Sequence, residues 1–132
     1  MRIAIGSIVV LLVGLLSQAQ IVGCPIEPTL VKNADSQIAI AFQNTSGKAI
    51  ASYRFRLTFY DVWGQSHSFP QSLRGNAPLA VNAHRTAIWQ SRLAMQFLSP
   101  SVQASVEQTT FMDGTVWFDD GSRACSVTSV QE

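Results

Sequence analysis

The sequence predicts an all-β protein, a single antiparallel β-sandwich of about seven strands behind an N-terminal signal peptide that is cleaved. Three observations predict this class. No stretch after Ala19 has a helical period, several stretches alternate apolar with polar residues, and clusters of turn residues separate them. A chain of 132 residues is long enough for one ordinary domain. We therefore expect a signal peptide over residues 1–19 and a β-sandwich domain over residues 20–132.

The N-terminal segment has the features of an export signal. Arg2 supplies a positive charge, and an apolar run covers residues 3–16. As a helix this run would span roughly 20 Å, which is too short for a bilayer core of about 30 Å. Ser17 and Ala19 are small residues at the positions that a signal peptidase reads, so we expect cleavage after Ala19. The alternatives are a membrane anchor and a buried helix, which the glycines in the run disfavour.

The clearest strand lies between residues 52 and 59. Tyr53, Phe55, Leu57 and Phe59 alternate with polar residues, so one face of this strand is buried and the other is wet. Before this strand we expect a strand over Ile38–Phe42 and a turn at 44–48. After it we expect a turn at 61–64, a return strand at 65–69 stopped by Pro70, a loop at 71–82, a strand at 85–90 with Ala87 and Trp89 on one side, and a helix or bent strand at 91–99. The C-terminal part should hold a strand from Val102 to Phe111, an Asp113-Gly114 hairpin turn, a strand at 116–118, a turn at 119–122 and a last strand at 124–127.

The two cysteines, Cys24 and Cys125, lie near the two ends of the mature chain. In an exported protein such a pair predicts a disulfide, here one that closes a loop of about 100 residues. The segment Ile21-Val22-Gly23-Cys24 also resembles a lipobox, in which a bacterial lipoprotein is cleaved before a cysteine that becomes acylated. The two interpretations exclude each other. We expect the disulfide, because lipidation would leave Cys125 as a lone thiol. A zinc site that includes the two histidines is the third alternative.

The charge balance argues against two classes of partner. Nine basic and eight acidic residues nearly cancel, and removal of Arg2 with the signal leaves eight of each. A neutral domain lacks the electrostatic footprint of a protein that binds nucleic acid or an anionic membrane surface. We expect no nucleic-acid partner and no stable membrane span in the mature chain.

Residues 38–65 resemble the FxLYD-type domain, a small extracellular β-sandwich of bacteria and archaea. The resemblance lies in the strand and Asn-rich turn of residues 42–48, and in Leu57-Thr58-Phe59-Tyr60-Asp61 followed by Gly64, where Leu and Phe are exchanged relative to the family. The ending from Asp113 through Cys125 looks like that of small secreted bacterial proteins of unknown role. The resemblance implies an immunoglobulin-like sandwich and export, and it brings no catalytic residues.

No catalytic constellation stands out in the sequence. His67 and His84 are the only histidines, and there is no G-x-S-x-G elbow, H-E-x-x-H motif or glycine-rich phosphate loop. A Ser–His–Asp triad that includes Asp61 can be imagined, but the chain has so many serines that this gives no evidence for catalysis. Asp61 is instead expected to cap the turn to Gly64. We predict that the protein is not an enzyme and needs no cofactor, with a small hydrolase as the remote alternative.

Three other groups of residues are candidates for binding. Calcium binds carboxylate oxygens of the kind carried by Asp113, Asp119 and Asp120. Asp-Gly pairs are more typical of hairpin turns than of calcium sites, so we expect no metal. Asn44-Thr45-Ser46 matches a glycosylation sequon, which we interpret as a turn. The candidate ligand-binding aromatics are Tyr60, on the polar face of its strand, Trp63, in a turn, and Trp117, which should face opposite to Val116 and Phe118.

The sequence thus favours an exported, non-catalytic β-sandwich module, secreted or periplasmic, that serves protein interaction or association with the cell envelope. Its partner is an unidentified protein or glycan. One alternative is a carbohydrate-binding module that stacks sugars on Tyr60, Trp63 or Trp117, against which stands the ordinary role of tryptophans such as Trp89 and Trp117 in closing a core. The other alternative is a lipid-anchored envelope lipoprotein. A free strand edge is a further place where a partner strand would pair.

Overall fold

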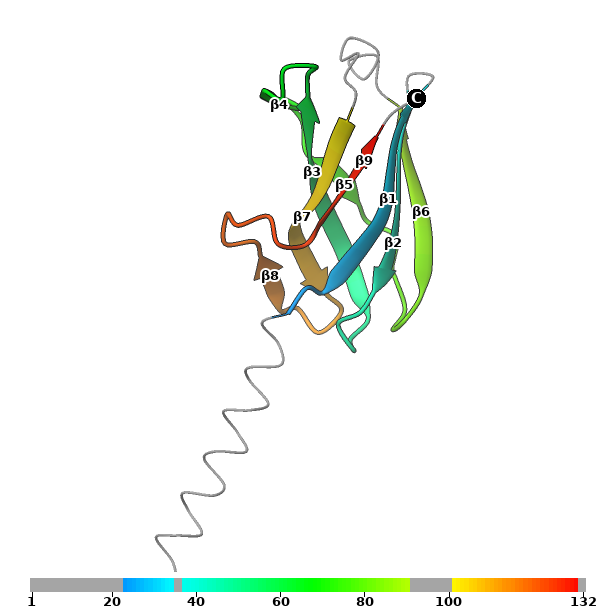
Figure 1. Ribbon diagram of the computed structural model, residues 1–132. Helices are drawn as coiled ribbons and strands as arrows, with labels where there is room; N and C mark the ends of the chain where they lie inside the picture. The colour runs from blue at the N-terminus through cyan, green and yellow to red at the C-terminus, as the bar shows by residue number, and fades with distance from the viewer. Residues whose placement is uncertain (1–22, 35–36, 91–100, 131–132) are drawn as a thin grey trace, which may run out of the picture.

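A computed structural model describes residues 23–34, 37–90 and 101–130. The described residues form two packed antiparallel sheets and no helix, as the sequence predicts (Figure 1). None of them belongs to a helix that is long and apolar enough to cross a membrane. The expected signal peptide, its cleavage site at Ala19 and the element expected at 91–99 lie outside the described residues. The strands are β1 (Ile26–Ala34), β2 (Gln37–Asn44), β3 (Ile50–Tyr60), β4 (Ser66–Ser68), β5 (Leu73–Gly75), β6 (His84–Gln90), β7 (Ser101–Phe111), β8 (Val116–Phe118) and β9 (Ser126–Val130).

The nine strands occupy seven rows. Sheet A has the order β1-β2-β6. In sheet B the long strands β3 and β7 pair with each other over their whole length. The short strands β4 and β5 follow one another along the outer side of β3, and β8 and β9 do the same along the outer side of β7. The prediction of about seven strands therefore matches the number of rows, while two rows are broken into short pieces.

The core lies between the two sheets and follows the predicted alternation. Tyr53, Phe55, Leu57 and Phe59 of β3 are all at most 5% exposed. Phe42 of β2 joins the sheets, since its ring centroid lies 4.9 Å from that of Tyr53 and 5.1 Å from that of Phe55. Burial of each such side chain stabilises the fold by about 1.5–3 kcal/mol. The alternating pattern therefore determines which face of each long strand is available to solvent.

The prediction missed β1, and it was wrong about part of the loop at 71–82. The register of β1 against β2 shifts between Pro28 and Leu30, so the buried residues Ile26 and Val31 lie an odd number of positions apart. A period of two cannot be read across such a bulge. Within the expected loop, β5 pairs with β3, and Leu79 forms a bridge to Ile50. Strands this short show no period of their own.

A second bulge, in β7, changes what the outer face of sheet B displays. Arg54 pairs with Gln108 and the next residue, Phe55, pairs with Val106, which leaves Glu107 as the extra residue. Beyond the bulge the buried position moves to Thr109, which has no exposed surface. As a result two consecutive residues, Glu107 and Gln108, are both partly exposed, where a regular strand would bury one of them.

The turn after β2 is organised by a fully buried side chain, that of Asn44. Its Nδ2 donates to the carbonyl oxygens of Lys48, Leu79 and Ala80 at 2.7, 3.2 and 3.1 Å, and its Oδ1 accepts from the backbone N–H of Ser46 at 3.0 Å. The prediction of a turn is confirmed. Because both ends of the amide are used inside the protein, the sequon asparagine is inaccessible to a glycosylating enzyme in the folded state.

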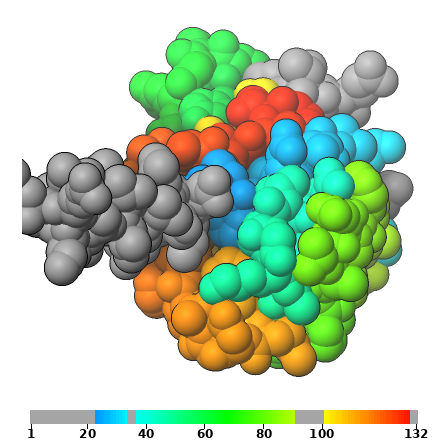
Figure 2. All heavy atoms as spheres, turned by 90° about the horizontal axis from the view of Figure 1, so that it is seen from below, coloured from blue at the N-terminus to red at the C-terminus, as the bar shows by residue number. Residues whose placement is uncertain are grey.

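Seen end-on, this turn lies between its two neighbours, the loop that leads into β6 and the β7–β8 hairpin (Figure 2). The backbone N–H of Asn82 donates to the carbonyl of Asn44 at 3.1 Å on one side, and the N–H of Met112 donates to the carbonyl of Ala49 at 2.9 Å on the other. Lys48 adds an exposed ion pair to Asp113 at 3.0 Å. Three connections of the two sheets are thus held together at one end of the domain.

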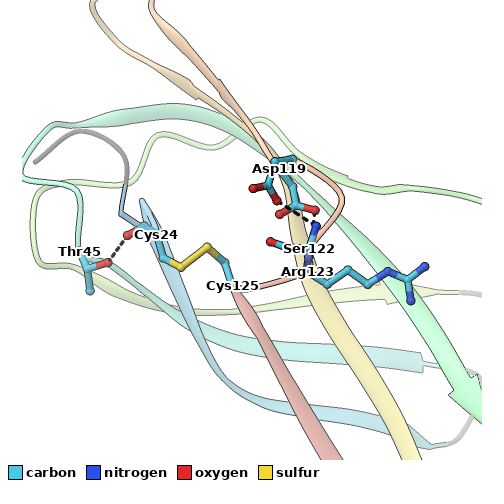
Figure 3. Close-up of a disulfide and its surroundings, with 7 residues drawn as sticks. Cys24, Thr45, Asp119, Ser122, Arg123 and Cys125 are labelled. Carbon is cyan, nitrogen blue, oxygen red and sulfur yellow. Dashed lines mark hydrogen bonds between the residues drawn. A yellow bond between two sulfur atoms is a disulfide. The ribbon is translucent and has the colours of Figure 1, made fainter. Parts of the chain in front are cut away.

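The predicted disulfide between Cys24 and Cys125 is present, with a Cα–Cα distance of 5.5 Å and 101 positions of sequence between the cysteines (Figure 3). The Oγ1 of Thr45 donates to the carbonyl of Cys24 at 2.9 Å, and the N–H of Val106 donates to the carbonyl of Cys125 at 2.9 Å. The bridge therefore ties the start of β1 to the segment before β9. A sulfur in this bond cannot also carry the thioether of a lipid anchor.

Gly75 provides a test of the packing under β5. A Cβ at this position would lie 2.3 Å from the ring of Tyr53, and that ring is packed against Phe42 and Phe55. We expect Gly75→Ala to lower the free energy of unfolding by about 1–3 kcal/mol, because the ring has to move inside a filled core. Urea unfolding measures the loss. Gly23→Ala is the matched control, since its Cβ would meet nothing within 4 Å. Equal stability of the two variants would contradict this packing.

Candidate functional site

The outer face of sheet B is polar along its centre. Ser52, Arg54, Arg56, Thr58 and Tyr60 alternate with the buried residues of β3. Their cross-strand partners on β7 carry hydroxyl or amide groups: Thr110, Gln108, Ser105, Gln103 and Ser101. Such side chains offer many hydrogen-bond donors and acceptors on a rigid surface. This face, which we call the polar face, is the candidate site.

Four arginines converge on the polar face. Arg54 and Arg56 come from β3, Arg74 comes from β5 as the direct partner of Arg54, and Arg123 comes from the segment before β9. Of the five arginines in the described residues, Arg85 alone is bound elsewhere, where it donates to the carbonyls of Ala77 and Pro78. The charge balance of the whole chain hides this local excess of positive charge.

Glu107, the bulge residue, neutralises part of that charge. One carboxylate oxygen lies 3.2 Å from a terminal nitrogen of Arg56, and the other lies 3.5 Å from Nε of Arg54 and accepts from Ser72 at 3.1 Å. Among the described residues Arg74 forms no ion pair. The polar face therefore keeps cationic groups that no carboxylate occupies.

Arg123 reaches the polar face because hydrogen bonds to Asp119 fix the turn that precedes it. Oδ2 of Asp119 accepts from the backbone N–H groups of Gly121 and Arg123 at 3.0 and 3.3 Å, and Arg123 itself adopts a left-handed backbone with φ of 56°. Figure 3 shows its side chain extending away from the neighbouring disulfide. The end of the side chain donates to the hydroxyl of Thr58 at 3.2 Å, which covers that threonine.

Two adjoining depressions lie on the polar face, and we call them together the arginine groove. The first has a volume of about 190 Å³, the second has about 270 Å³, and Arg54 lines both. The first is lined by Ser52, Tyr53, Arg54, Arg74, Asn76, Gln108 and Thr110. The second is lined by Arg54, Arg56, Ser105, Val106, Glu107, Phe118, Asp119, Gly121 and Arg123. The groove is open and more polar than apolar, with one exposed aromatic ring, Phe118, which is 63% exposed.

The three predicted aromatics do not form a row. Trp117 faces opposite to Val116 and Phe118, as predicted, and it packs against the core. Tyr60 lies on the polar face at the far end of β3, where its hydroxyl donates to Gln103 at 3.3 Å. Trp63 is 82% exposed in the β3–β4 turn. Tyr60 and Trp117 pair with opposite ends of β7, eight positions apart and hence roughly 27 Å along the strand.

The histidines lie in different places. Nε2 of His67 is 3.0 Å from Oδ2 of Asp61 at the β3–β4 turn, whereas His84 is exposed at the start of β6. Oδ1 of Asp61 accepts from the N–H groups of Trp63 and Gln65 at 2.9 Å each, so the predicted capping role is confirmed. The hydrogen bond from His67, more than the backbone bonds, lowers the pKa of Asp61. In the part of the chain that the structure describes, His67 has no hydrogen bond to a serine.

The three C-terminal aspartates are used inside turns, Asp113 in the β7–β8 hairpin and Asp119 with Asp120 in the turn before β9. Asp113 binds the hydroxyl and the N–H of Thr115, and these bonds, with help from Lys48, lower its pKa to about 2. Asp120 accepts from the N–H of Ser122 at 2.9 Å, and bonds to that serine lower its pKa. Within residues 23–34, 37–90 and 101–130 no group of three or more His, Cys, Asp or Glu side chains is arranged to hold a metal ion.

No protein-family model, curated protein or solved structure matches this chain. The fold and the site therefore define its class by themselves. It is an all-β domain of two packed antiparallel sheets, cross-linked by one disulfide, with an arginine-lined groove on the outer face of one sheet.

Proposed function

We propose that the protein is an exported, non-catalytic module that binds an anionic partner in the arginine groove, in the periplasm, at the cell envelope or outside the cell. The observation that carries this proposal is the convergence of Arg54, Arg56, Arg74 and Arg123 around depressions in which Glu107 is the sole carboxylate paired with an arginine. Guanidinium groups suit carboxylate, sulfate and phosphate oxygens because they offer several donors in a planar fork.

Export after cleavage at Ala19 is part of the proposal. A disulfide between Cys24 and Cys125 supports it, because disulfides persist in oxidising compartments. The same bond is a reason to prefer a freely exported domain over a lipid-anchored one.

An immunoglobulin-like topology is also part of the proposal. If β4 and β5 count as one row and β8 and β9 as another, the described strands make seven rows in sequence order. The first, second and fifth of these rows (β1, β2 and β6) share one sheet. The third, fourth, sixth and seventh rows share the other. Immunoglobulin-like sandwiches likewise separate their first, second and fifth strands from their third, sixth and seventh. This agreement supports the proposal.

The groove is a binding site rather than a reaction centre in this proposal. Its lining residues include no histidine that could activate a serine and no cysteine. The wall is made mainly of guanidinium, amide and hydroxyl groups, and the carboxylates of Glu107 and Asp119 are bound to arginines or to the backbone of a turn.

The test is an NMR titration of the ¹⁵N-labelled protein with soluble polyanions. It is carried out at about 0.15 M salt, where electrostatic attraction between exposed charges is screened beyond about 8 Å. We expect the Nε–H resonances of Arg54 and Arg74 to shift with at least one carboxylate-, sulfate- or phosphate-bearing polymer. The double variant Arg54→Gln/Arg74→Gln should lose binding by about ten-fold or more, equivalent to about 1.4 kcal/mol. Lys32→Gln, which removes an exposed charge from β1, is the matched control. Arginine resonances that no polyanion moves would refute the proposal.

A further inference from the structure

The position of the groove on the sheet limits what kind of ligand can bind in it. Its centre lies over β3 and β7, and β3 is hydrogen-bonded to β7 on one side and to β4 and β5 on the other. β7 is likewise paired on both sides. The two ends of the groove, at Arg74 and Phe118, lie on the edge strands β5 and β8. A peptide strand that docks by adding to a sheet needs unpaired backbone N–H and C=O groups. The centre of the groove offers side chains instead.

The side chains form an ordered row across the sheet. Arg74 on β5 pairs with Arg54 on β3, Arg54 pairs with Gln108 on β7, and Gln108 pairs with Phe118 on β8. Neighbouring strands lie about 4.8 Å apart, so the row spans roughly 14 Å. It has two cationic groups at one end, an amide in the middle and an exposed aromatic ring at the other end. This is the length of a short run of sugar rings.

The first depression adds donors and acceptors without adding negative charge. Ser52, Asn76 and Thr110 line it beside Arg54 and Arg74, and no acidic residue is among its lining side chains. Tyr53, whose ring packs in the core, also lines it. Amide and hydroxyl groups both donate and accept, which matches the hydroxyl groups of a sugar. The arginines match an acidic substituent on that sugar.

We infer that the arginine groove binds an acidic polysaccharide, a conclusion that rests on the proposed function and narrows its ligand. One pyranose ring places its C–H face on Phe118, and hydroxyl groups of the next unit bond Gln108 and Asn76. A carboxylate or sulfate group of the chain lies between Arg54 and Arg74. The aromatic ring and the unpaired arginine act on different parts of the same polymer. An acidic polypeptide fits less well, since its backbone offers no sugar ring to stack on Phe118 and finds no free backbone to pair with over β3 and β7, at the centre of the groove.

The experiment compares defined polymers by isothermal titration at about 0.15 M salt. The probes are polygalacturonate, which carries carboxylates, dextran sulfate, which carries sulfates, neutral dextran, polyglutamate and a DNA duplex. We expect one of the two acidic polysaccharides to bind at least about ten-fold tighter than polyglutamate and DNA, and neutral dextran not to bind. Which of the two binds identifies the acidic group.

Two variants locate the aromatic contact. We expect Phe118→Ala to weaken binding of the acidic polysaccharide by about five- to ten-fold while leaving any weak polyglutamate binding unchanged. The ring is 63% exposed, so its loss should leave the unfolding temperature unaltered. Trp63→Ala is the matched aromatic control, with the side chain 82% exposed in the β3–β4 turn and outside the groove lining.

The outcomes separate the inference from the proposed function. If polyglutamate or DNA binds as tightly as either polysaccharide, and Arg54→Gln/Arg74→Gln abolishes that binding, the anion-binding function stands and the polysaccharide inference fails. The inference also fails if Trp63→Ala, and not Phe118→Ala, removes binding, because the sugar site is then at the turn. Absence of binding to every probe overturns both.

Discussion

Replacing the cysteines, as Cys24→Ser/Cys125→Ser, is expected to lower the free energy of unfolding by about 4.7 kcal/mol at 25 °C. The disulfide spans 101 positions of sequence, and so it removes much of the freedom of the unfolded chain. Small domains are stable by only about 5–15 kcal/mol in total, so the variant should be close to its folding limit. Urea unfolding followed by tryptophan fluorescence measures the change.

Reduction of the native protein is the control for this variant. Wild-type protein in excess dithiothreitol should unfold at the same urea concentration as the double serine variant, because both lack the cross-link while all other side chains are the same. The single variant Cys24→Ser should match them. If the double variant and the oxidised wild type unfold at one concentration, the bond contributes nothing to stability and the expectation is wrong.

Substitution of Asn44 is expected to have the second-largest effect. Asn44→Asp places a carboxylate oxygen where Nδ2 now donates to three carbonyl oxygens, at a position with no exposed surface. An uncompensated buried charge destabilises a protein by about 3–5 kcal/mol. For a domain of this size such a loss lowers the melting temperature by roughly 15 °C or more. Thermal unfolding by circular dichroism at neutral pH measures it.

Asn82→Asp makes the same chemical change at an exposed position one connection away. It should leave the melting temperature within a few degrees of wild type, since an exposed surface substitution is usually worth less than about 0.5 kcal/mol. Asn44→Ala separates charge from hydrogen bonding, and it should fall between the two aspartate variants. A melting temperature for Asn44→Asp equal to that of Asn82→Asp would show that the Asn44 amide does not organise the turn.

The long strands and several turns could be predicted from the sequence because their signals are local. The alternation from Tyr53 to Phe59 reports a two-faced strand without reference to any other residue. Gly114, with φ of 88°, and Asp61, bonded to the N–H groups that follow it, use turn chemistry that spans only a few positions. The pairing of Cys24 with Cys125 followed from the presence of just two cysteines together with the expected export.

The candidate site could not be predicted in the same way, because it depends on register. Arg74 lies beside Arg54 only because β5 pairs with β3, and Arg123 arrives from 67 positions further along the chain than Arg56. The bulge at Glu107 then moves Gln108 onto the same face. No local pattern carries such information, since a shift of one residue reverses every side chain of a strand. A plot of charge along the alternating positions of β3 would have drawn attention to Arg54 and Arg56.

The position of the disulfide also has a mechanical consequence. A pulling force applied between a point before Cys24 and a point after Cys125 passes through the covalent bond. The enclosed residues, which include both long strands and the arginine groove, then carry almost none of the tension. The extension available before the bond breaks is that of the terminal segments and of β9. In a single-molecule stretching experiment the oxidised domain should therefore lengthen far less than the reduced one, and a ligand held in the groove would stay bound under tension.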